Sequence, residues 1–197
     1  MFVLLALFVS FTSSAFARPS TASANNLGIA NDYNAFVFDK GNFKEGWSEV
    51  QGRLAIGGDA NIRNYSVARL VPLTDVAVPY NTVIGGGGNA QTWSGTLYGS
   101  VVSNGNTTTI RTPDVRGSVF ALRALDLGGS SGSGGTVQGD AVYGTTFRKD
   151  SNVTVQGQIR QASTALPFSF SAAQTDLLAL SSRLKNLSAT GTTTVFS

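Results

Sequence analysis

Short apolar runs separated by polar turns recur through the middle of the chain. Five stretches share one form: an apolar residue, any residue, glycine, any residue and then an apolar run. They start at Val50, Trp93, Val115, Val137 and Val155, so the starts are 43, 22, 22 and 18 residues apart. A period of roughly 20 residues is typical of solenoids, in which each coil buries its apolar face only against its neighbours. The pattern therefore predicts an all-β solenoid.

Each unit predicts one short strand whose alternate side chains point inward. The glycine would stand at a corner of the coil, where a side chain would collide or would need a positive φ. Because identical coils stack their strands in parallel, we expect a right-handed parallel β-helix. An antiparallel sandwich with hairpins at similar spacing is the alternative.

The apolar period changes after Pro167, where the spacing becomes 3, 4, 3, 4 and 3 residues. This spacing predicts an amphipathic helix over about residues 168–187, with Ser171 and Gln174 as a capping box. A helix of that length, about 30 Å, matches the height of several stacked coils. We expect it to be packed alongside the solenoid and to cover one apolar wall. The apolar stripe consists of Phe170, Ala173, Leu177, Leu180, Leu184 and Leu187.

The N-terminus reads as a signal peptide. Residues 2–11 are almost wholly apolar, too few to span a bilayer, and an A-x-A cleavage site ends at Ala17. We therefore expect residues 1–17 to be a leader, 18–26 a short linker and 27–197 a single domain of a secreted protein. No later apolar run reaches transmembrane length.

The amino-acid composition limits the kinds of catalytic and metal site that the chain can form. The chain has 197 residues, a net charge of +3, and no His or Cys. Nucleophilic triads that use histidine, disulfides and the usual zinc sites are thereby excluded, and no cofactor or metal is predicted. The basic residues are scattered, so a nucleic-acid interface is not indicated.

Few residues suggest chemistry, and each has a plainer explanation. Asp59 and Asp140 both follow glycine in the repeat and could flank a glycoside or share a cation, although turn aspartates commonly bond their own backbone. The run at Gly85–Gly88 lacks the Lys-Ser/Thr of a phosphate loop and reads as a flexible loop. Four aromatic residues could form a contact strip if they face outward, or belong to the core: Trp47, Tyr65, Trp93 and Tyr98.

If the protein is exported, four Asn-x-Ser/Thr triplets become possible N-glycosylation sites. Their asparagines are Asn64, Asn106, Asn152 and Asn186.

Two N-terminal segments carry a family resemblance. The stretch Leu27–Phe38 (LGIANDYNAFVF) and the stretch Val50–Ala60 (VQGRLAIGGDA), followed by Asn64-Tyr65-Ser66, resemble the opening of the choice-of-anchor A domain, also labelled an adhesin or collagen-binding-like domain. The resemblance covers about residues 25–190. It implies an exported surface domain that adheres, and it transfers no catalytic residues.

The C-terminus departs from that family. Members usually continue with further coils after the helix, whereas here Thr192–Ser197 resembles only the first strand of one. No anchor is visible after Leu187. We therefore expect the domain to be truncated at its C-terminus.

The sequence thus predicts a secreted or cell-surface glycoprotein that is a non-catalytic adhesion module. Its partner would be an extracellular matrix or cell-wall macromolecule, either protein or polysaccharide. One alternative is a β-helix polysaccharide lyase or hydrolase. A second is an ice- or crystal-surface-binding protein, prompted by Thr107–Thr109 and Thr192–Thr194, although the repeat alignment shows no threonine ladder across coils.

Overall fold

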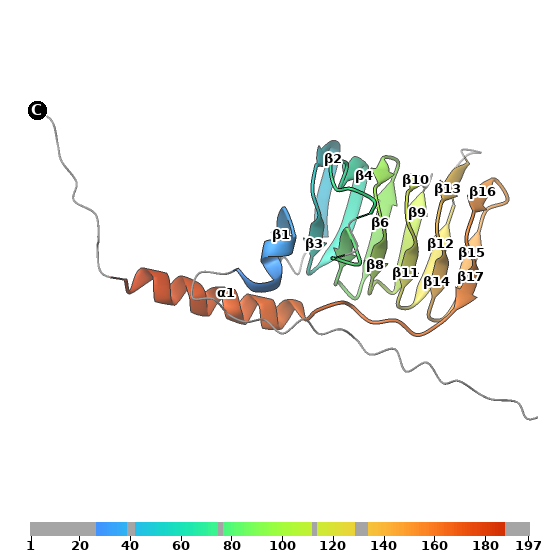
Figure 1. Ribbon diagram of the computed structural model, residues 1–197. Helices are drawn as coiled ribbons and strands as arrows, with labels where there is room; N and C mark the ends of the chain where they lie inside the picture. The colour runs from blue at the N-terminus through green and yellow to red at the C-terminus, as the bar shows by residue number, and fades with distance from the viewer. Residues whose placement is uncertain (1–26, 39–41, 75–76, 112–113, 129–133, 188–197) are drawn as a thin grey trace, which may run out of the picture.

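The computed structural model describes residues 27–38, 42–74, 77–111, 114–128 and 134–187. Within these ranges the chain forms a parallel β-solenoid of about six turns with one helix packed alongside (Figure 1). Each strand pairing in both sheets is parallel. The predicted parallel solenoid is confirmed, and the antiparallel sandwich is wrong.

Two sheets make up the walls of the solenoid. The seven-stranded sheet has the order β1 (Ala35–Val37), β3 (Leu54–Ile56), β5 (Thr82–Ile84), β8 (Val101–Ser103), β11 (Val119–Ala121), β14 (Ala141–Tyr143) and β17 (Ile159–Gln161). The ten-stranded sheet has the order β15 (Phe147–Lys149), β12 (Ala124–Leu127), β9 (Thr107–Arg111), β6 (Asn89–Trp93), β4 (Asp59–Val67), β7 (Thr96–Leu97), β10 (Asp114–Val115), β13 (Gly135–Val137) and β16 (Val153–Val155), with β2 (Asn42–Val50) paired to β4.

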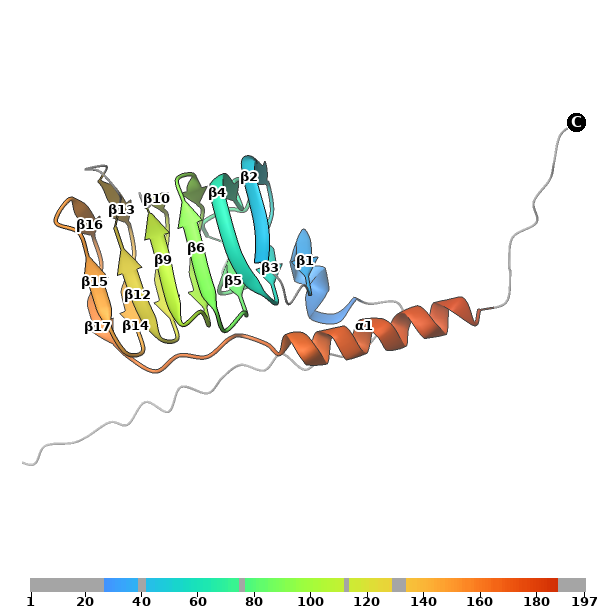
Figure 2. The same cartoon turned by 180° about the vertical axis from the view of Figure 1, so that it is seen from behind.

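The ten-stranded sheet is folded along a line parallel to the solenoid axis, which divides it into two halves. Together with the seven-stranded sheet, these halves give the coils three faces. The bend passes through β4 at Asn64, which has a φ of 48°, and between β6 and β7 at Ser94 and Gly95, with φ values of 55° and 92°. We call the seven-stranded sheet the covered face. The half formed by the start of β4 with β6, β9, β12 and β15 is the polar face (Figure 2). The half formed by the end of β4 with β7, β10, β13 and β16 is the hydroxyl face.

One continuous apolar core fills the space between the three faces. Alternation along each strand sends every second side chain inward, and parallel register stacks these side chains from coil to coil. Leu54, Val101 and Val119 line the covered face from within, while Val67 and Val115 do the same for the hydroxyl face; all five are at most 1% exposed.

Strand register corrects the repeat alignment drawn from the sequence. Leu97 pairs with both Val67 and Val115, so the unit before Val115 is Leu97-Tyr98-Gly99 and not Trp93-Ser94-Gly95. Trp93 instead aligns with Arg63 and Arg111 on the outer side of β6. The chain between β4 and β5 lengthens one coil, so the interval between the units at Val67 and Leu97 is longer than the others.

The repeated glycines stack at one corner, where adjacent coils touch backbone to backbone. A Cβ on Gly117 would lie 2.4 Å from the carbonyl carbon of Gly99, and one on Gly139 would lie 2.8 Å from that of Gly117. Gly157 stands in the same relation to Gly139, at 2.6 Å. These approaches leave no room for a side chain, which confirms the expected role of the glycine.

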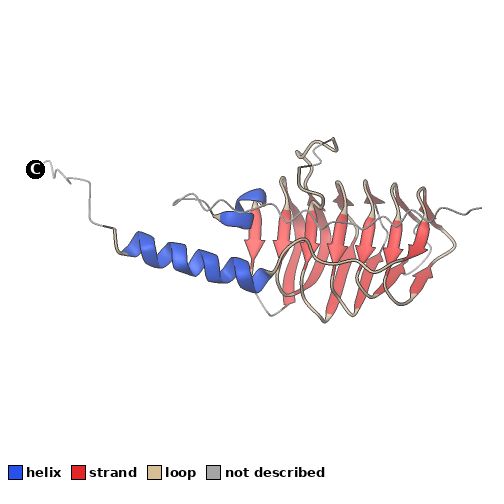
Figure 3. Cartoon of the chain, turned by 60° about the horizontal axis from the view of Figure 1, so that its bottom comes forward, coloured by secondary structure: helices blue, strands red, loops and turns tan. Residues whose placement is uncertain are grey.

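The covered face is closed by the chain that returns after β17. Residues 162–169, the return segment, run in extended form across the outside of the seven-stranded sheet (Figure 3). Alternate residues of this segment are half-buried, and they include Leu166 and Phe168, which pack against the outer side of the sheet. The rings of Tyr33 and Phe36 lie 5.6 and 5.5 Å from that of Phe168.

The helix α1 (Phe170–Lys185) follows the return segment and packs beside the first coil, near η1 (Gly28–Asp32), as Figure 1 shows. Its N-cap is Ser169, whose hydroxyl accepts a hydrogen bond from Ala172 N at 3.3 Å, so the expected capping box at Ser171 is wrong. The apolar wall is covered mainly by the return segment. The helix therefore braces one end of the solenoid, since it extends beyond the first coil.

The apolar stripe of the helix is buried only in its first part. Ala173 and Leu180 are 6% and 5% exposed, whereas Leu184 and Leu187 are 50% and 67% exposed. Among the described residues no helix is long and apolar enough to cross a membrane.

Candidate functional site

Two of the three faces remain accessible for binding. The return segment, η1 and the chain around Tyr80 close the covered face, where Ala55, Val83 and Val102 are fully buried although they point outward from the sheet. No described segment lies over the polar or the hydroxyl face in Figures 1 and 2. A ligand of extended shape must therefore use one of these two faces.

The polar face carries two rows of hydrophilic side chains in strict register. In the central row each coil contributes one residue at the same height, because the strands pair residue for residue. From β4 to β15 this row is Asn61, Gln91, Thr109, Asp126 and Arg148, and Lys44 of β2 pairs with Asn61 at its N-terminal end. Thr109 is only 6% exposed. The second row lies two positions further along the strands and consists of Arg63, Trp93 and Arg111.

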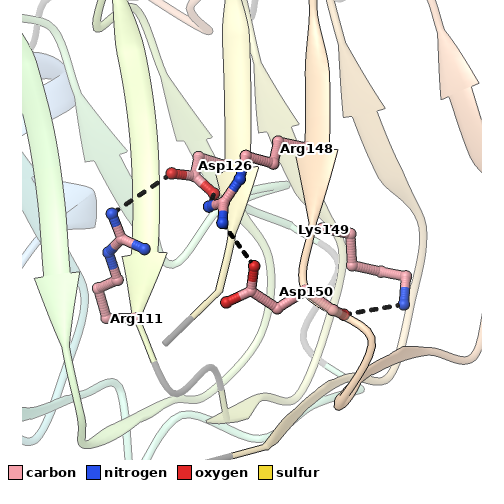
Figure 4. A network of polar contacts seen from close by, with 5 residues as sticks. All are labelled: Arg111, Asp126, Arg148, Lys149 and Asp150. Carbon is pink, nitrogen blue, oxygen red and sulfur yellow. Dashed lines mark hydrogen bonds and ion pairs between the residues drawn. The ribbon is translucent and has the colours of Figure 1, made fainter. Parts of the chain in front are cut away.

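Ion pairs tie the C-terminal half of the polar face together (Figure 4). Asp126 accepts Arg148 at 2.8 Å and lies 3.4 Å from Arg111, while Arg148 also reaches Asp150 at 2.7 Å. The hydrogen bond to Asp126 raises the pKa of the exposed Arg148 guanidinium above its ordinary value. Lys149 donates to the carbonyl of Val153 at 2.7 Å. The network holds long side chains in fixed positions on the surface.

The N-terminal half of the polar face is organised by an aromatic contact. The guanidinium of Arg63 lies over the ring of Trp93, 4.9 Å from its centroid, and its Nε donates to Asn61 Oδ1 at 3.4 Å. Such cation–π contacts stabilise an exposed arginine by about 0.5–1 kcal/mol. Trp93 is half-buried, so part of its ring stays at the surface.

The hydroxyl face carries a single row of short polar side chains. Each member stands one position before an inward Val or Leu, and from β4 onward the members are Ser66, Thr96, Asp114, Thr136 and Thr154. Glu49 of β2 pairs with Ser66 at the start of the row. Thr96 donates to Asp114 at 2.6 Å, and the Ser66 hydroxyl accepts from Thr96 N at 3.2 Å. Asp114 separates Thr96 from Thr136, so the row is not an uninterrupted threonine ladder. The polar residue before each valine would have revealed the row.

The two aspartates of the repeat do not form a site. Asp59 lies at the corner between β3 and β4, and Asp140 lies at a different corner, between β13 and β14. The carboxylate of Asp59 accepts from Gly88 N and that of Asp140 accepts from Gln158 N, each at 2.9 Å. Both are therefore backbone-bonding turn residues. Within the described ranges no three acidic residues gather as metal ligands.

The glycine run and the aromatic residues also have structural roles. Gly86 packs against the backbone of the preceding coil, 2.3 Å from Gly58 C to an added Cβ, so Gly85–Gly88 forms a tight corner and not a flexible loop. Tyr65 and Tyr98 pack partly against the core. Trp47 is 86% exposed at the N-terminal end of the solenoid, so the four aromatics make no continuous strip.

One cleft of about 320 Å³ lies at the corner between the hydroxyl and covered faces. Leu73, Val78 and Pro79 form one wall, and Arg116, whose guanidinium lies 4.6 Å from the ring centroid of Tyr98, forms the other. The cleft combines an apolar wall with a cation, but it has no row of groups in register.

The four possible glycosylation sites are all exposed. Asn64 lies at the bend of β4, Asn106 beside Arg123, Asn152 in a turn and Asn186 at the C-cap of α1. Their glycosylation stays a prediction. The signal peptide, its cleavage site at Ala17 and the strand expected at Thr192–Ser197 lie outside the described residues.

Residues 26–197 match the model of a family described as "Putative Ice-binding-like adhesive domain". No curated protein and no solved structure is significantly similar to the chain. An adhesive family points to binding of an external partner and to a role without catalysis. The chain belongs to this family of ice-binding-like adhesive domains.

Proposed function

We propose that this chain is a secreted or cell-surface adhesion module that binds an extracellular macromolecule through an open sheet face and catalyses no reaction. The observation that carries the proposal is the contrast between the three faces. One is sealed by the return segment, whereas two present polar rows with one side chain per coil. Such repetition suits a ligand that itself repeats.

The N-terminal motif supports a finer assignment. The stretch Leu27–Phe38 and the stretch Val50–Ala60 resemble the choice-of-anchor A domain, which would make the module one of several adhesive domains carried on differently anchored proteins. The predicted leader at residues 1–17 supports export, and an extracellular location would make the exposed asparagines available for glycosylation.

The enzyme alternative has less support. A glycosidase needs two carboxyl groups that flank one glycosidic bond, with one of them protonated. Asp126 is occupied by two arginines, and Asp114 accepts the Thr96 hydroxyl. Asp59 and Asp140 lie at separate corners of the coil. We infer that these carboxylates stabilise the coils and take no part in hydrolysis.

One experiment tests both halves of the proposal. The secreted chain is incubated with collagen, chitin, cellulose, β-glucan and host cells, and bound protein and released reducing or unsaturated ends are measured. We expect binding to at least one partner and no released ends. Release that Asp140→Asn abolishes would replace the adhesion proposal by the enzyme alternative.

Binding to ice or to a crystal surface is a second candidate, and the hydroxyl face favours it. Thr136 and Thr154 lie on neighbouring coils, about 4.8 Å apart, and Thr96 lies two coils before Thr136. A regular array of hydroxyl and methyl groups could match a crystal lattice. Asp114 interrupts the array with a charge. Inhibition of ice growth that Thr136→Val changes would support this candidate, whereas unmodified ice growth in the presence of the chain would remove it.

A further inference from the structure

We propose that the polar face binds an extended, uncharged β-1,4-linked polysaccharide that lies along the solenoid axis, with one sugar ring over each coil. This inference deepens the adhesion function proposed above and rests on it. It selects one of the two open faces and one class of ligand. Four properties of that face support the choice: its charge, its hydrogen-bonding groups, and the order and spacing of its side chains.

The charge of the polar face argues against a polyanion as the ligand. Its outward side chains include four cations, Lys44, Arg63, Arg111 and Arg148, against three carboxylates, Asp59, Asp126 and Asp150, which leaves a balance of +1. Two of the arginines pair with Asp126. A face that binds polyanions would offer a surplus of cations free to meet anionic groups.

The hydrogen-bonding groups of the central row fit hydroxyl groups. The amides of Asn61 and Gln91 each offer two donor hydrogens and one acceptor oxygen, and each arginine has five donors, more than its carboxylate partners occupy. A sugar hydroxyl both donates and accepts, so it can bond either kind of group. A partner with only donors or only acceptors would leave half of this row unsatisfied.

The side chains of both rows of the polar face are partly ordered before a ligand binds, and this order makes binding more favourable. Long side chains lose rotamer entropy when they bind a ligand, about 0.5–1.5 kcal/mol each. Arg148 is held by two aspartates, and Arg63 is held by Trp93 and Asn61. These contacts restrict both side chains before the ligand arrives, which lowers the entropy lost on binding, while Arg148 stays 60% exposed. Trp93 adds apolar surface at the part of its ring that Arg63 leaves uncovered.

Spacing selects an extended chain. Neighbouring strands lie about 4.8 Å apart, so five coils set out the central row over about 19 Å. A sugar ring in an extended β-1,4-linked chain advances by nearly the distance between strands. Successive rings of such a chain are turned over, so every second ring would present the same groups to every second coil, and affinity would accumulate along the row.

The same features set this face apart from the hydroxyl face. Three arginines and a partly exposed tryptophan make the polar face uneven and partly charged, which suits an extended hydroxylated chain better than a flat ice lattice. The hydroxyl face, with its short side chains, provides an internal control.

The test uses the full chain and two classes of soluble and insoluble probe. Binding to cellulose and chitin is measured by co-sedimentation, and binding to cello- and chito-oligosaccharides of two to six sugars by calorimetry. We expect Gln91→Ala to weaken binding about tenfold and Asn61→Ala to weaken it similarly. Thr136→Ala on the hydroxyl face is the matched control and should bind normally. Affinity should rise with oligosaccharide length up to about five sugars, one for each coil of the row.

Salt separates an uncharged ligand from a charged one. Raising NaCl from about 0.1 M to about 1 M shortens the Debye length from about 10 Å to about 3 Å, so binding to an uncharged glycan should hardly change. Tight binding to pectate that salt abolishes would overturn the assignment of an uncharged ligand. Melting temperatures of the variants within a few degrees of wild type, as expected for surface changes, would show that lost binding is not lost folding.

Other outcomes distinguish the two proposals. Loss of glycan binding in Thr136→Ala but not in Gln91→Ala would move the site to the hydroxyl face and overturn this inference. Binding to collagen alone would overturn the ligand class and leave the adhesion function standing. Failure to bind any macromolecule would overturn both.

Discussion

The close packing of neighbouring coils can be tested at a single glycine. A Cβ added at Gly117 would lie 2.4 Å from Gly99 C and 2.6 Å from both Gly99 O and Ser100 N. Carbon atoms in contact normally stay about 3.5–4.0 Å apart. All three neighbours are backbone atoms, so no side-chain rotation relieves the overlap. Gly117→Ala therefore forces two coils apart at this corner.

The cost of that separation follows from the bonds it strains. The corner is held by Arg116 N to Leu97 O and by Gly139 N to Gly117 O, both at 2.9 Å. Overpacking a tight site costs about 1–3 kcal/mol, and each weakened hydrogen bond adds about 1 kcal/mol. We expect Gly117→Ala to lower the free energy of unfolding by about 3 kcal/mol, a large share of the roughly 5–15 kcal/mol typical of a domain.

Urea denaturation followed by circular dichroism measures this loss, and Gly87→Ala is the matched control. Gly87 is exposed, and a Cβ there would have no atom within 4 Å. Its substitution should leave stability unchanged or raise it by about 0.4–1 kcal/mol, because alanine restricts the unfolded chain. If both variants unfold at the same urea concentration, the corner is not closely packed, and the backbone-to-backbone stacking of the coils is refuted.

Three further predictions concern the helix, the return segment and export. Leu180→Asp should lower the free energy of unfolding by about 4 kcal/mol, because it buries a carboxylate where the leucine side chain is 5% exposed. The control Leu184→Asp, at a position 50% exposed, should change the free energy of unfolding by about 0.5 kcal/mol or less, and equal melting temperatures of the two variants would contradict this prediction. Phe168→Ala should cost about 2–4 kcal/mol and expose the return segment to proteases, as limited proteolysis would detect. N-terminal sequencing of the secreted protein should begin near Arg18; an intracellular product that starts at Met1 would refute export.

Much of the fold could be predicted because the decisive signals are local. The V-x-G unit at Val115, Val137 and Val155 combines an inward apolar residue with a glycine corner, and each signal lies within a few residues. The helix likewise follows from a 3- and 4-residue spacing that persists over several turns. Its N-cap was misplaced by two residues, because serines stand at both Ser169 and Ser171 and only the three-dimensional path distinguishes them.

The binding faces could not be predicted in the same way. Asn61, Gln91 and Asp126 are unrelated in sequence spacing, and they form one row only because loops of different length return each strand to the same register. The sequence pattern also placed Trp93 at the position that Leu97 occupies, a shift of four residues in one coil. Figure 4 shows side chains from three coils in one network that no single segment contains.

By itself, then, the sequence determined the kind of coil, the glycine corner and the helix, because backbone sterics and apolar periodicity act between near neighbours along the chain. Only the tertiary structure decided which face is sealed and which side chains share a row. The return segment seals the covered face through Phe168, whose partners Tyr33 and Phe36 lie more than a hundred residues away in sequence. Such contacts depend on the register in which whole coils stack, and that register is set by loop lengths and by the shared core.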